Sequence, residues 1–338
     1  MTESSSSAGA KTRPQTSAGY TVKDLGVLSG DTISSATALN ATGQAAGESD
    51  TPGSAIGSLF ANGVVKNIDT LNAGVSIGEA IDANSQVAGY MLTSPSSPFH
   101  AFLYSNGTMQ DINNSKLFPA GTQAFGINDS GDVVGKGDVS SSGIFHAFLY
   151  AGGKMVDIGT LGGTQGTAYA INDSNQIVGA SLTASEVEHA FLYANGKMTD
   201  LGLPKGAIAT GATAINSKGT IVGTIYPGGG SDAALYSNGQ WTNLGNFTGA
   251  VGSSATGINT NGQMVGTAQF PNIYHPFRAG KHVPFIVRSG SLVDLNTLIA
   301  PGSGFTLTDA VGINDSGQIA TDATNTSGLK HAVVLSPK

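Results

Sequence analysis

Cysteine is absent from this chain of 338 residues, which excludes disulfides, thiolate nucleophiles and cysteine-ligated metal sites. Charged residues make up only 11% of the sequence, the net charge is −7, and lysine and arginine form no cluster or stripe. Because neutralising phosphates requires such a stripe, we expect no nucleic-acid binding. No apolar run approaches the roughly 20 residues of a membrane-spanning helix, so we expect no membrane span.

The common catalytic signatures are missing as well. The sequence contains no Gly-x-Ser-x-Gly in the strand-to-helix context of a nucleophile elbow, no His-Glu-x-x-His pair, no phosphate loop, and no dinucleotide fingerprint between a strand and a helix. The sequence therefore implies no cofactor. It leaves open whether the protein is an enzyme.

Glycine, by contrast, is abundant at 49 residues, which suits a protein with many tight turns. A pattern repeats seven times, reading A-x-[AG]-[IL]-[ND], a polar turn, Q-[IV]-V-G, a variable stretch, H-A-F-L-Y, an Asn-Gly-type turn and M-x-D-[IL]-G. A period of about 44 residues is typical of stacked or radial supersecondary units. The apolar anchor of each unit is Leu39, Ile81, Ile127, Ile171, Ile215, Ile258 and Ile313.

Each unit contains four short stretches of strand character. In the fourth unit we expect strands at 168–171, 176–179, 189–193 and 198–201. The Asn195-Gly196 pair supplies the positive φ angles that a tight hairpin needs. Four strands in a repeat of this length form an antiparallel meander, which is the pattern of a β-propeller blade.

The sequence therefore predicts an all-β fold, a seven-bladed β-propeller with four-stranded antiparallel blades. The segment 20–26 has the sequence of a fourth strand, whereas the last unit ends after its third strand. We expect this N-terminal strand to complete the last blade and close the ring, which removes exposed sheet edges. Residues 1–19 lack the apolar core of a secretory signal, and we expect a disordered leader there. Residues 20–338 would then form a single domain, and we expect a monomer.

The repeated His-Ala-Phe-Leu-Tyr sequence at 100–104, 146–150 and 189–193 resembles the defining motif of the HAF-repeat family of bacterial proteins. The resemblance covers nearly everything from Tyr20 to Lys338. It implies a propeller architecture and an extracellular or periplasmic location. It implies no particular reaction.

The largest departure from the repeat is an insertion at 270–284 in the sixth unit, rich in aromatic, cationic and titratable side chains. Such a loop can stack on an anionic or sugar-like ligand and form hydrogen bonds with it. It can equally be an irregular loop that caps the ring. The candidate ligand-binding residues here are Tyr274, Phe277, Arg278 and Lys281, and the candidate acid–base residues are His275 and His282.

A second departure lies in the innermost strands, where the residue two positions before the anchor differs between units. A carboxylate at this position, Glu79, is costly near the axis unless it is solvated or paired. It either lines a wet channel or acts as a catalytic or ligand-binding group, and Asp309 is a similar but weaker candidate. At the same position, Phe125 and Tyr169 are candidates for the apolar wall of a ligand pocket.

The repeated histidines and aspartates favour a structural role. One histidine per blade is spread around the ring by symmetry, whereas the ligands of a zinc ion must all lie within about 2 Å of it. We expect each histidine to make the same local hydrogen bond in its own blade, and each repeated aspartate to accept backbone N–H groups. The Asn-Asp-Ser turns supply one carboxylate each, too few for a typical calcium loop. We therefore expect no metal site.

Three functions remain. The first is a non-catalytic binding module for a glycan or small molecule at the rim of the channel. The second is an enzyme of hydrolase, lyase or cyclase/isomerase type, in which Glu79 or an insertion histidine acts as acid or base and Arg278 or Lys281 steadies negative charge. The third is a purely structural or adhesive surface protein. The sequence does not identify the substrate.

Overall fold

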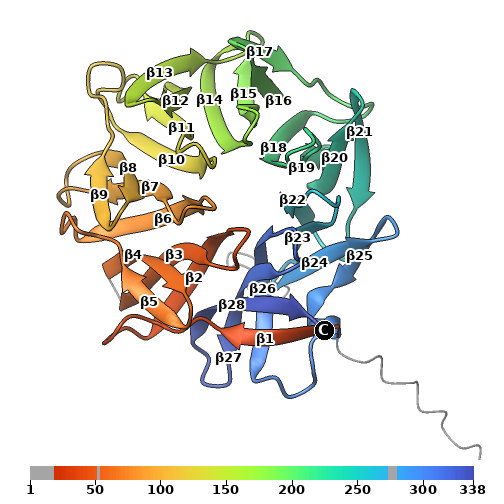
Figure 1. Ribbon diagram of the computed structural model, residues 1–338. Coiled ribbons are helices and arrows are strands. Elements are labelled where there is room, and N and C mark those ends of the chain that lie inside the picture. Colours follow the sequence, from red (N-terminus) through yellow and green to blue (C-terminus); the bar gives the residue numbers. More distant parts are fainter. Residues whose placement is uncertain (1–18, 52–53, 273–279) are drawn as a thin grey trace, which may run out of the picture.

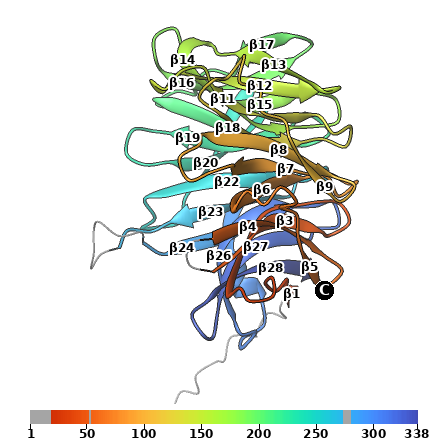
Figure 2. The ribbon, with the colours of Figure 1, turned by 90° about the vertical axis from the view of Figure 1, so that its left-hand side faces the viewer.

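A computed structural model describes residues 19–51, 54–272 and 280–338. In these residues the chain forms antiparallel sheets of four strands, arranged around a central opening (Figure 1). The fold is all-β and of the β-propeller type. Figure 2 shows the same sheets from the side, with their strands running across the molecule.

The first three units follow one another along the chain. The first contains β2 (Ile33–Leu39), β3 (Ala45–Thr51), β4 (Ser54–Ala61) and β5 (Val64–Asn67). The second contains β6 (Val75–Ile81), β7 (Val87–Leu92), β8 (Phe99–Ser105) and β9 (Thr108–Asp111). The third contains β10 (Thr122–Ile127), β11 (Val133–Asp138), β12 (Phe145–Ala151) and β13 (Lys154–Gly159).

The next three units repeat this order. They are β14 (Gly162–Ile171), β15 (Ile177–Thr183), β16 (Glu188–Ala194) and β17 (Lys197–Asp200); then β18 (Ala209–Ile215), β19 (Ile221–Tyr226), β20 (Asp232–Ser237) and β21 (Gln240–Gly245); then β22 (Gly252–Ile258), β23 (Met264–Gln269), β24 (His282–Arg288) and β25 (Ser291–Asp294). The short 3-10 helix η1 (Leu295–Leu298) follows β25. A parallel bridge between Phe145 and Gln165 joins the third and fourth units into one eight-stranded sheet.

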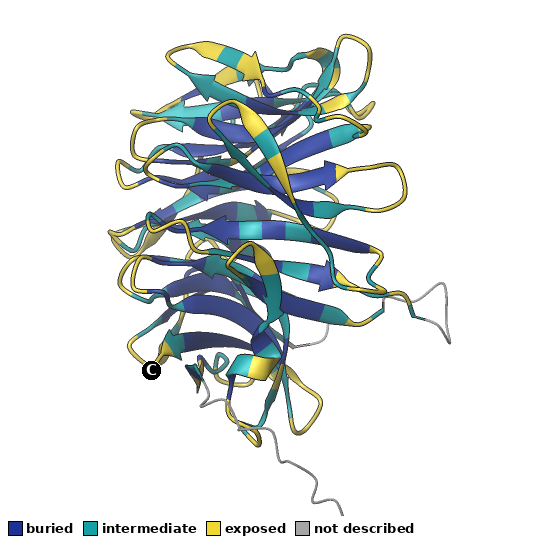
Figure 3. Ribbon diagram, turned by 90° about the vertical axis from the view of Figure 1, so that its right-hand side faces the viewer, coloured by how far each residue is buried: buried dark blue, intermediate teal, exposed yellow. Residues whose placement is uncertain are grey.

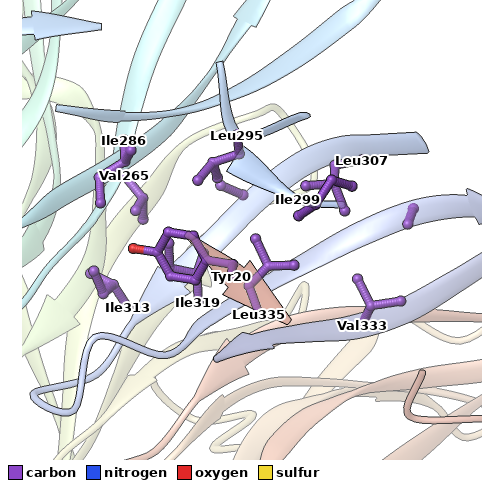
Figure 4. Close-up of a cluster of buried hydrophobic side chains, with 12 residues drawn as sticks. Tyr20, Val265, Ile286, Leu295, Ile299, Leu307, Ile313, Ile319, Val333 and Leu335 are labelled. Atoms are coloured by element: carbon purple, nitrogen blue, oxygen red, sulfur yellow. The ribbon is translucent and has the colours of Figure 1, made fainter. Parts of the chain in front are cut away.

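The last sheet combines both ends of the described chain. It contains β26 (Phe305–Ile313), β27 (Ile319–Asn325), β28 (Lys330–Pro337) and, beside β28, the N-terminal strand β1 (Tyr20–Asp24). Tyr20 lies opposite Pro337 and is only 4% exposed. Figure 4 shows its ring among Ile313, Ile319 and Leu335. Burial of this ring and of the strand's backbone hydrogen bonds holds β1 against β28.

The turns form where the sequence places residues that tolerate a positive φ. In the fourth unit Asn195 and Gly196 have φ values of 53° and 76°, which a tight hairpin between β16 and β17 needs. The strands are longer than predicted: β14 begins at Gly162 and not at 168. The sixth-unit insertion is shorter than predicted, because its last three residues, 282–284, belong to β24.

The apolar core lies between neighbouring sheets. One cluster combines Leu59 and Ile68 of the first unit with Val87 and Phe102 of the second. Figure 3 shows buried residues along the strands and exposed residues at the turns. No helix in the described ranges is long and apolar enough to cross a membrane.

A second set of contacts joins the units near the axis. The residue after the anchor is asparagine in six units, and its side-chain Nδ2 donates to the backbone carbonyl of the equivalent residue in the next unit. We call this set the asparagine belt. Its donors are Asn40, Asn128, Asn172, Asn216, Asn259 and Asn314, and the last of them donates to the carbonyl of Asn40.

Candidate functional site at the channel

The innermost strand of every unit carries a β-bulge at the same position. The bulge leaves one residue without a partner on the neighbouring strand, and bulges of this kind re-aim a side chain. These seven unpaired residues line a cavity of about 260 Å³ in the channel. We call them the channel ring: Thr37, Glu79, Phe125, Tyr169, Thr213, Thr256 and Val311.

The repeated Val-Gly of the second strand explains why the bulge forms there. In the fourth unit, Gly179 lies opposite Ala168, just before the bulge residue Tyr169. A Cβ on Gly179 would lie 1.9 Å from the carbonyl oxygen of Thr167. In the first six units glycine permits this close approach of the two strands, and in the fourth it allows the geometry that turns Tyr169 into the channel. In the seventh unit Thr321 takes the place of this glycine opposite Ala310, and a further bulge between Leu307 and Asp309 precedes it.

The threonines of the channel ring have a structural role. Thr256 Oγ1 donates to the carbonyl oxygen of Ala310 in the next unit at 2.7 Å. Thr37 and Thr213 donate to carbonyls of the following unit in the same way. These hydroxyls are therefore occupied in holding neighbouring innermost strands together.

Aromatic side chains replace threonine on one side of the ring. The ring centroids of Phe99 and Tyr90 are 5.0 Å apart, those of Tyr90 and Phe125 are 6.3 Å apart, and those of Phe125 and Tyr169 are 5.9 Å apart. These are ordinary distances for interacting aromatic rings. We call this run of four side chains, from the second, third and fourth units, the aromatic wall.

The wall ends at the exposed ring of Tyr169. Tyr169 is 40% exposed and Tyr226 of the next unit is 36% exposed. Burial raises the pKa of both tyrosines, and the negative Glu188 carboxylate raises it further. Burial also raises the pKa of Glu188 itself. Aromatic faces therefore lie beside an acidic group at this part of the channel mouth.

Glu79 lies beside Tyr90, the second ring of the wall, and the two side chains form a hydrogen bond. Burial raises the pKa of Glu79 to about 7, the Tyr90 hydroxyl lowers it by a hydrogen bond, and the negative Glu48 raises it again. Burial and the two carboxylates raise the pKa of Tyr90 to about 12. Glu79 is therefore half protonated near neutral pH and can either donate or accept a hydrogen bond.

An acidic region of the seventh and first units adjoins Glu79. The carboxylate of Asp322 accepts hydrogen bonds from Ala36 N at 2.9 Å and from Ser35 Oγ at 2.8 Å. Lys330 Nζ lies 2.7 Å from the same carboxylate. Asp322 thus joins two units, and its carboxylate is already occupied by these partners and not free to bind a ligand. Burial raises its pKa.

The structure brings some of the predicted site residues together and separates others. Glu79, Phe125 and Tyr169 all line the same cavity. His282 instead contacts Asp309, with Nδ1 2.8 Å from Oδ1, in the sixth and seventh units. Lys281 is exposed. The predictions for Tyr274, His275, Phe277 and Arg278 lie outside the described residues.

Sequence reasoning missed Tyr90 and Phe99. Tyr90 follows the glycine of the repeated Val-Gly, and the residue at this place varies as strongly as the channel ring does. Across the units it is Glu48, Tyr90, Lys136, Ala180, Thr224, Thr267 and Asp322. This variation is a signal in the sequence from which Tyr90 could have been identified as a candidate site residue.

The repeated histidines make the same local contact in each of their units, as predicted. His100, His146, His189 and His331 direct Nδ1 at the aspartate of the adjacent fourth strand, at distances of 2.7 to 2.9 Å. Each aspartate also accepts a backbone N–H two residues later, for example from Gly159 to Asp157 at 2.7 Å. In the fifth unit the donor and the carboxylate exchange strands: Asn243 Nδ2 of the fourth strand donates to Asp232 Oδ2 of the third at 2.8 Å.

The described ranges contain no group of three or more histidine, aspartate or glutamate side chains that could hold a metal ion. The described histidines are each used within their own units or, for His282, with a single carboxylate of the next unit. No donor set for a metal is therefore evident in this part of the chain.

No protein-family model matches the sequence, and no curated protein matches it. Solved structures do match the fold. A puromycin-hydrolysing peptidase of Mycobacterium tuberculosis has a TM-score of 0.56 and 10% identity over 95% of this chain and 55% of its own. TolB of Acinetobacter baumannii has a TM-score of 0.48 and 11% identity, covering 88% of this chain and 64% of its own. The chain thus spans less than two thirds of either protein. At these identities the likeness concerns the fold alone.

Proposed function

We propose that this protein is a non-catalytic binding module that holds a glycan or small molecule against the aromatic wall at the mouth of the channel. The observation that carries the proposal is the asymmetry of the channel ring. Threonine or valine occupies four of its seven positions, whereas Glu79, Phe125 and Tyr169 occupy three consecutive ones. A purely structural ring has no need for this difference.

The chemistry of the wall suits a ligand with both an apolar face and hydroxyl groups. The exposed ring of Tyr169 offers a surface for stacking. Glu79, with its pKa near 7, can exchange hydrogen bonds with a hydroxyl on the ligand in either protonation state. Small-molecule sites typically combine an apolar surface with a small number of polar groups.

Glycan arrays and isothermal titration calorimetry would test this proposal. Tyr169→Ala should weaken binding of any captured ligand about tenfold or more, because it removes a stacking surface worth roughly 1.5 kcal/mol. Val311→Ala, on the threonine side of the ring, is the matched control and should leave affinity unchanged. Equal affinity of Tyr169→Ala and the unaltered protein would place the ligand elsewhere and overturn the proposal.

A second candidate is an enzyme at the same place, favoured by one observation. Burial holds the pKa of Glu79 near 7, where a general acid–base group is most effective. A captured ligand that is converted to product by the unaltered protein but only bound by Glu79→Gln would establish this alternative. Retention of turnover in Glu79→Gln would exclude Glu79 from the chemistry.

We also propose a seven-bladed ring closed by β1, in a single HAF-repeat domain that is monomeric and located outside the cytoplasm. The pairing of β1 with β28 and the hydrogen bond from Asn314 to the Asn40 carbonyl support closure. The His–Asp pairs give the repeated motif a physical reason. Light scattering of the purified protein would test the oligomeric state, and fractionation of the producing cell would test the location.

A further inference from the structure

A second cavity, of about 300 Å³, lies between the fifth, sixth and seventh units, on the side of the ring away from the aromatic wall. It shares Thr256 and Val311 with the channel cavity. Its volume is at the lower end of the range for small-molecule sites. Hydroxyl, amide and carboxyl side chains dominate its lining, which contains no aromatic ring among the described residues. The polar lining residues are Ser231, Ser253, Ser254, Thr256, Thr267, Gln269 and Asp309.

Asp309 faces this cavity because β26 carries a bulge that the repeat does not explain. Its register with β27 shifts once between Ala310 and Gly312, as at the shared bulge of the innermost strands, and once more between Leu307 and Asp309. The extra residue changes the direction of the side chain that follows. At the equivalent position, Ser35 and Ser254 carry small hydroxyls, so Asp309 adds a charge.

His282 contacts Asp309 in a different manner from the repeated histidines. Those histidines pair with an aspartate on the neighbouring strand of their own sheet, whereas His282 of β24 reaches across to β26 of the next unit at 2.8 Å. Both side chains are about one third exposed. The pair therefore joins two units at the edge of the cavity, and the carboxylate accepts a hydrogen bond while facing solvent.

The backbone fixes the base of the cavity. A parallel bridge pairs Ser231 with Gly252, and Ser253 N donates to Ser231 O at 2.8 Å. Thr267 Oγ1 accepts from Ala310 N at 3.1 Å, and Ser254 Oγ lies 2.7 Å from Thr224 Oγ1. The last two contacts hold the hydroxyls of Thr267 and Ser254 in place before any ligand arrives, which lowers the entropic cost of binding.

We propose that this cavity is a second binding site, independent of the aromatic wall, for a neutral polyhydroxylated molecule of the monosaccharide or polyol class. The Asp309–His282 pair carries a carboxylate acceptor and a ring nitrogen that is not used in the contact between them. Ser231, Ser254, Thr267 and Gln269 add donors and acceptors, whereas the hydroxyls of Ser253 and Thr256 are already used within the fold. Without an aromatic ring in the described lining, recognition rests on hydrogen bonds to hydroxyl groups and not on stacking.

Saturation-transfer NMR with D-glucose, D-galactose, L-fucose and myo-inositol as probes, each at millimolar concentration, tests the site. At least one probe should bind, and Asp309→Asn should weaken its binding about tenfold, because a hydrogen bond to a charged acceptor is lost. Ser231→Ala, at the base of the cavity, should weaken binding of the same probe. It serves as a second variant if Asp309→Asn folds poorly.

Two controls separate this site from the rest of the molecule. His146→Gln disrupts a His–Asp pair of the same chemistry outside the cavity and should leave binding unchanged. Tyr169→Ala should also leave it unchanged, so failure of one site does not imply failure of the other. Absence of binding by all four probes would overturn the proposal. So would a probe that binds Asp309→Asn and Ser231→Ala as tightly as it binds the unaltered protein.

Discussion

Glu79 illustrates how a single position in a repeat acquires distinct chemistry. Four units place threonine or valine at this bulge, where a hydroxyl or methyl group is easily accommodated. A carboxyl group in the same partly buried place resists ionisation, because removal from water disfavours its charged form. The Tyr90 hydroxyl offsets only part of this effect.

We expect the stability of the protein to fall as the pH rises from about 4.5 to about 7, in part because of Glu79. Its pKa is raised from 4.5 to about 7, so the folded protein binds this proton more tightly than the unfolded chain does. The ionised form above pH 7 therefore lowers the free energy of unfolding, by up to about 3 kcal/mol. Glu79→Gln should remove this contribution and be the more stable protein at pH 8.

Urea denaturation at pH 5 and pH 8 measures the effect. Glu48 and Asp322 also have raised pKa values, so the comparison of Glu79→Gln with the unaltered protein isolates one group. The exposed Glu186, changed to glutamine, is the matched control. An identical pH slope in the unaltered protein and Glu79→Gln would contradict the assigned pKa.

The fifth unit suggests a second prediction for the repeated histidines. Asn243 and Asp232 exchange the roles of aspartate and histidine, yet the hydrogen bond between the strands is kept. The double substitution His146→Asp with Asp157→Asn should therefore cost less than about 0.5 kcal/mol in the free energy of unfolding. His146→Asp alone places two carboxylates opposite each other and should cost about 1 kcal/mol.

A double-mutant cycle followed by urea denaturation gives the coupling between the two positions. The Asp157→Asn single variant completes the cycle. Additive effects of the two single substitutions would argue that the contact between the third and fourth strands contributes nothing to stability.

The turns after the innermost strands are the elements that join neighbouring units. Each asparagine of the belt accepts two backbone N–H bonds within its own turn and donates across to the next unit, as Asn172 does to the Asn216 carbonyl at 3.0 Å. The second unit departs from this pattern. Asp82 replaces asparagine and, as a carboxylate, has no hydrogen to donate to the Asn128 carbonyl.

Asp82→Asn should therefore stabilise the protein by about 1 kcal/mol at pH 7, because it completes the belt and removes a buried charge. Burial raises the pKa of Asp82, in keeping with the cost of that charge. The converse change, Asn172→Asp, should destabilise by about 1 to 3 kcal/mol. Thermal and urea denaturation of the two variants would measure both changes, and destabilisation by Asp82→Asn would show that the aspartate is needed for another reason.

At the scale of the whole molecule, both ends of the described chain lie in one sheet. Lys338 N donates to Gly19 O at 3.1 Å, so the end of β28 lies beside the start of β1. The two strands are antiparallel, and a short Asn-Gly turn from Lys338 to Gly19 would join them as an ordinary hairpin. The last sheet would then be a continuous meander like the others.

We expect a circular permutant with this turn, opened between the exposed Ser29 and Gly30, to fold with a stability within about 2 kcal/mol of the parent. Deletion of residues 19–25 should instead expose the edge of β28 and the cluster around Tyr20, giving aggregates or dimers. Light scattering and urea denaturation distinguish these outcomes. A monomeric deletion variant of unchanged stability would mean that β1 is dispensable.

Much of the architecture could be predicted because the interactions that specify it are local. Hairpins between the strands depend on Asn-Gly turns, and the His–Asp contacts join residues 11 positions apart, as in His146 and Asp157. Because these local interactions recur in every unit, the repeat pattern predicts the strand order and the propeller type without any knowledge of the contacts between units. The same rules identified the channel position of Glu79, Phe125 and Tyr169.

The sequence alone determined the repeating unit, its four strands and the positions at which the units differ. Only the tertiary structure decided which of these differing residues meet. Tyr90 touches Phe125, 35 residues away and in another sheet, and Asp309 turns toward His282 because of an irregular bulge. Such contacts depend on how the sheets pack and on the register within each sheet, and the repeat pattern specifies neither at the positions where it is broken.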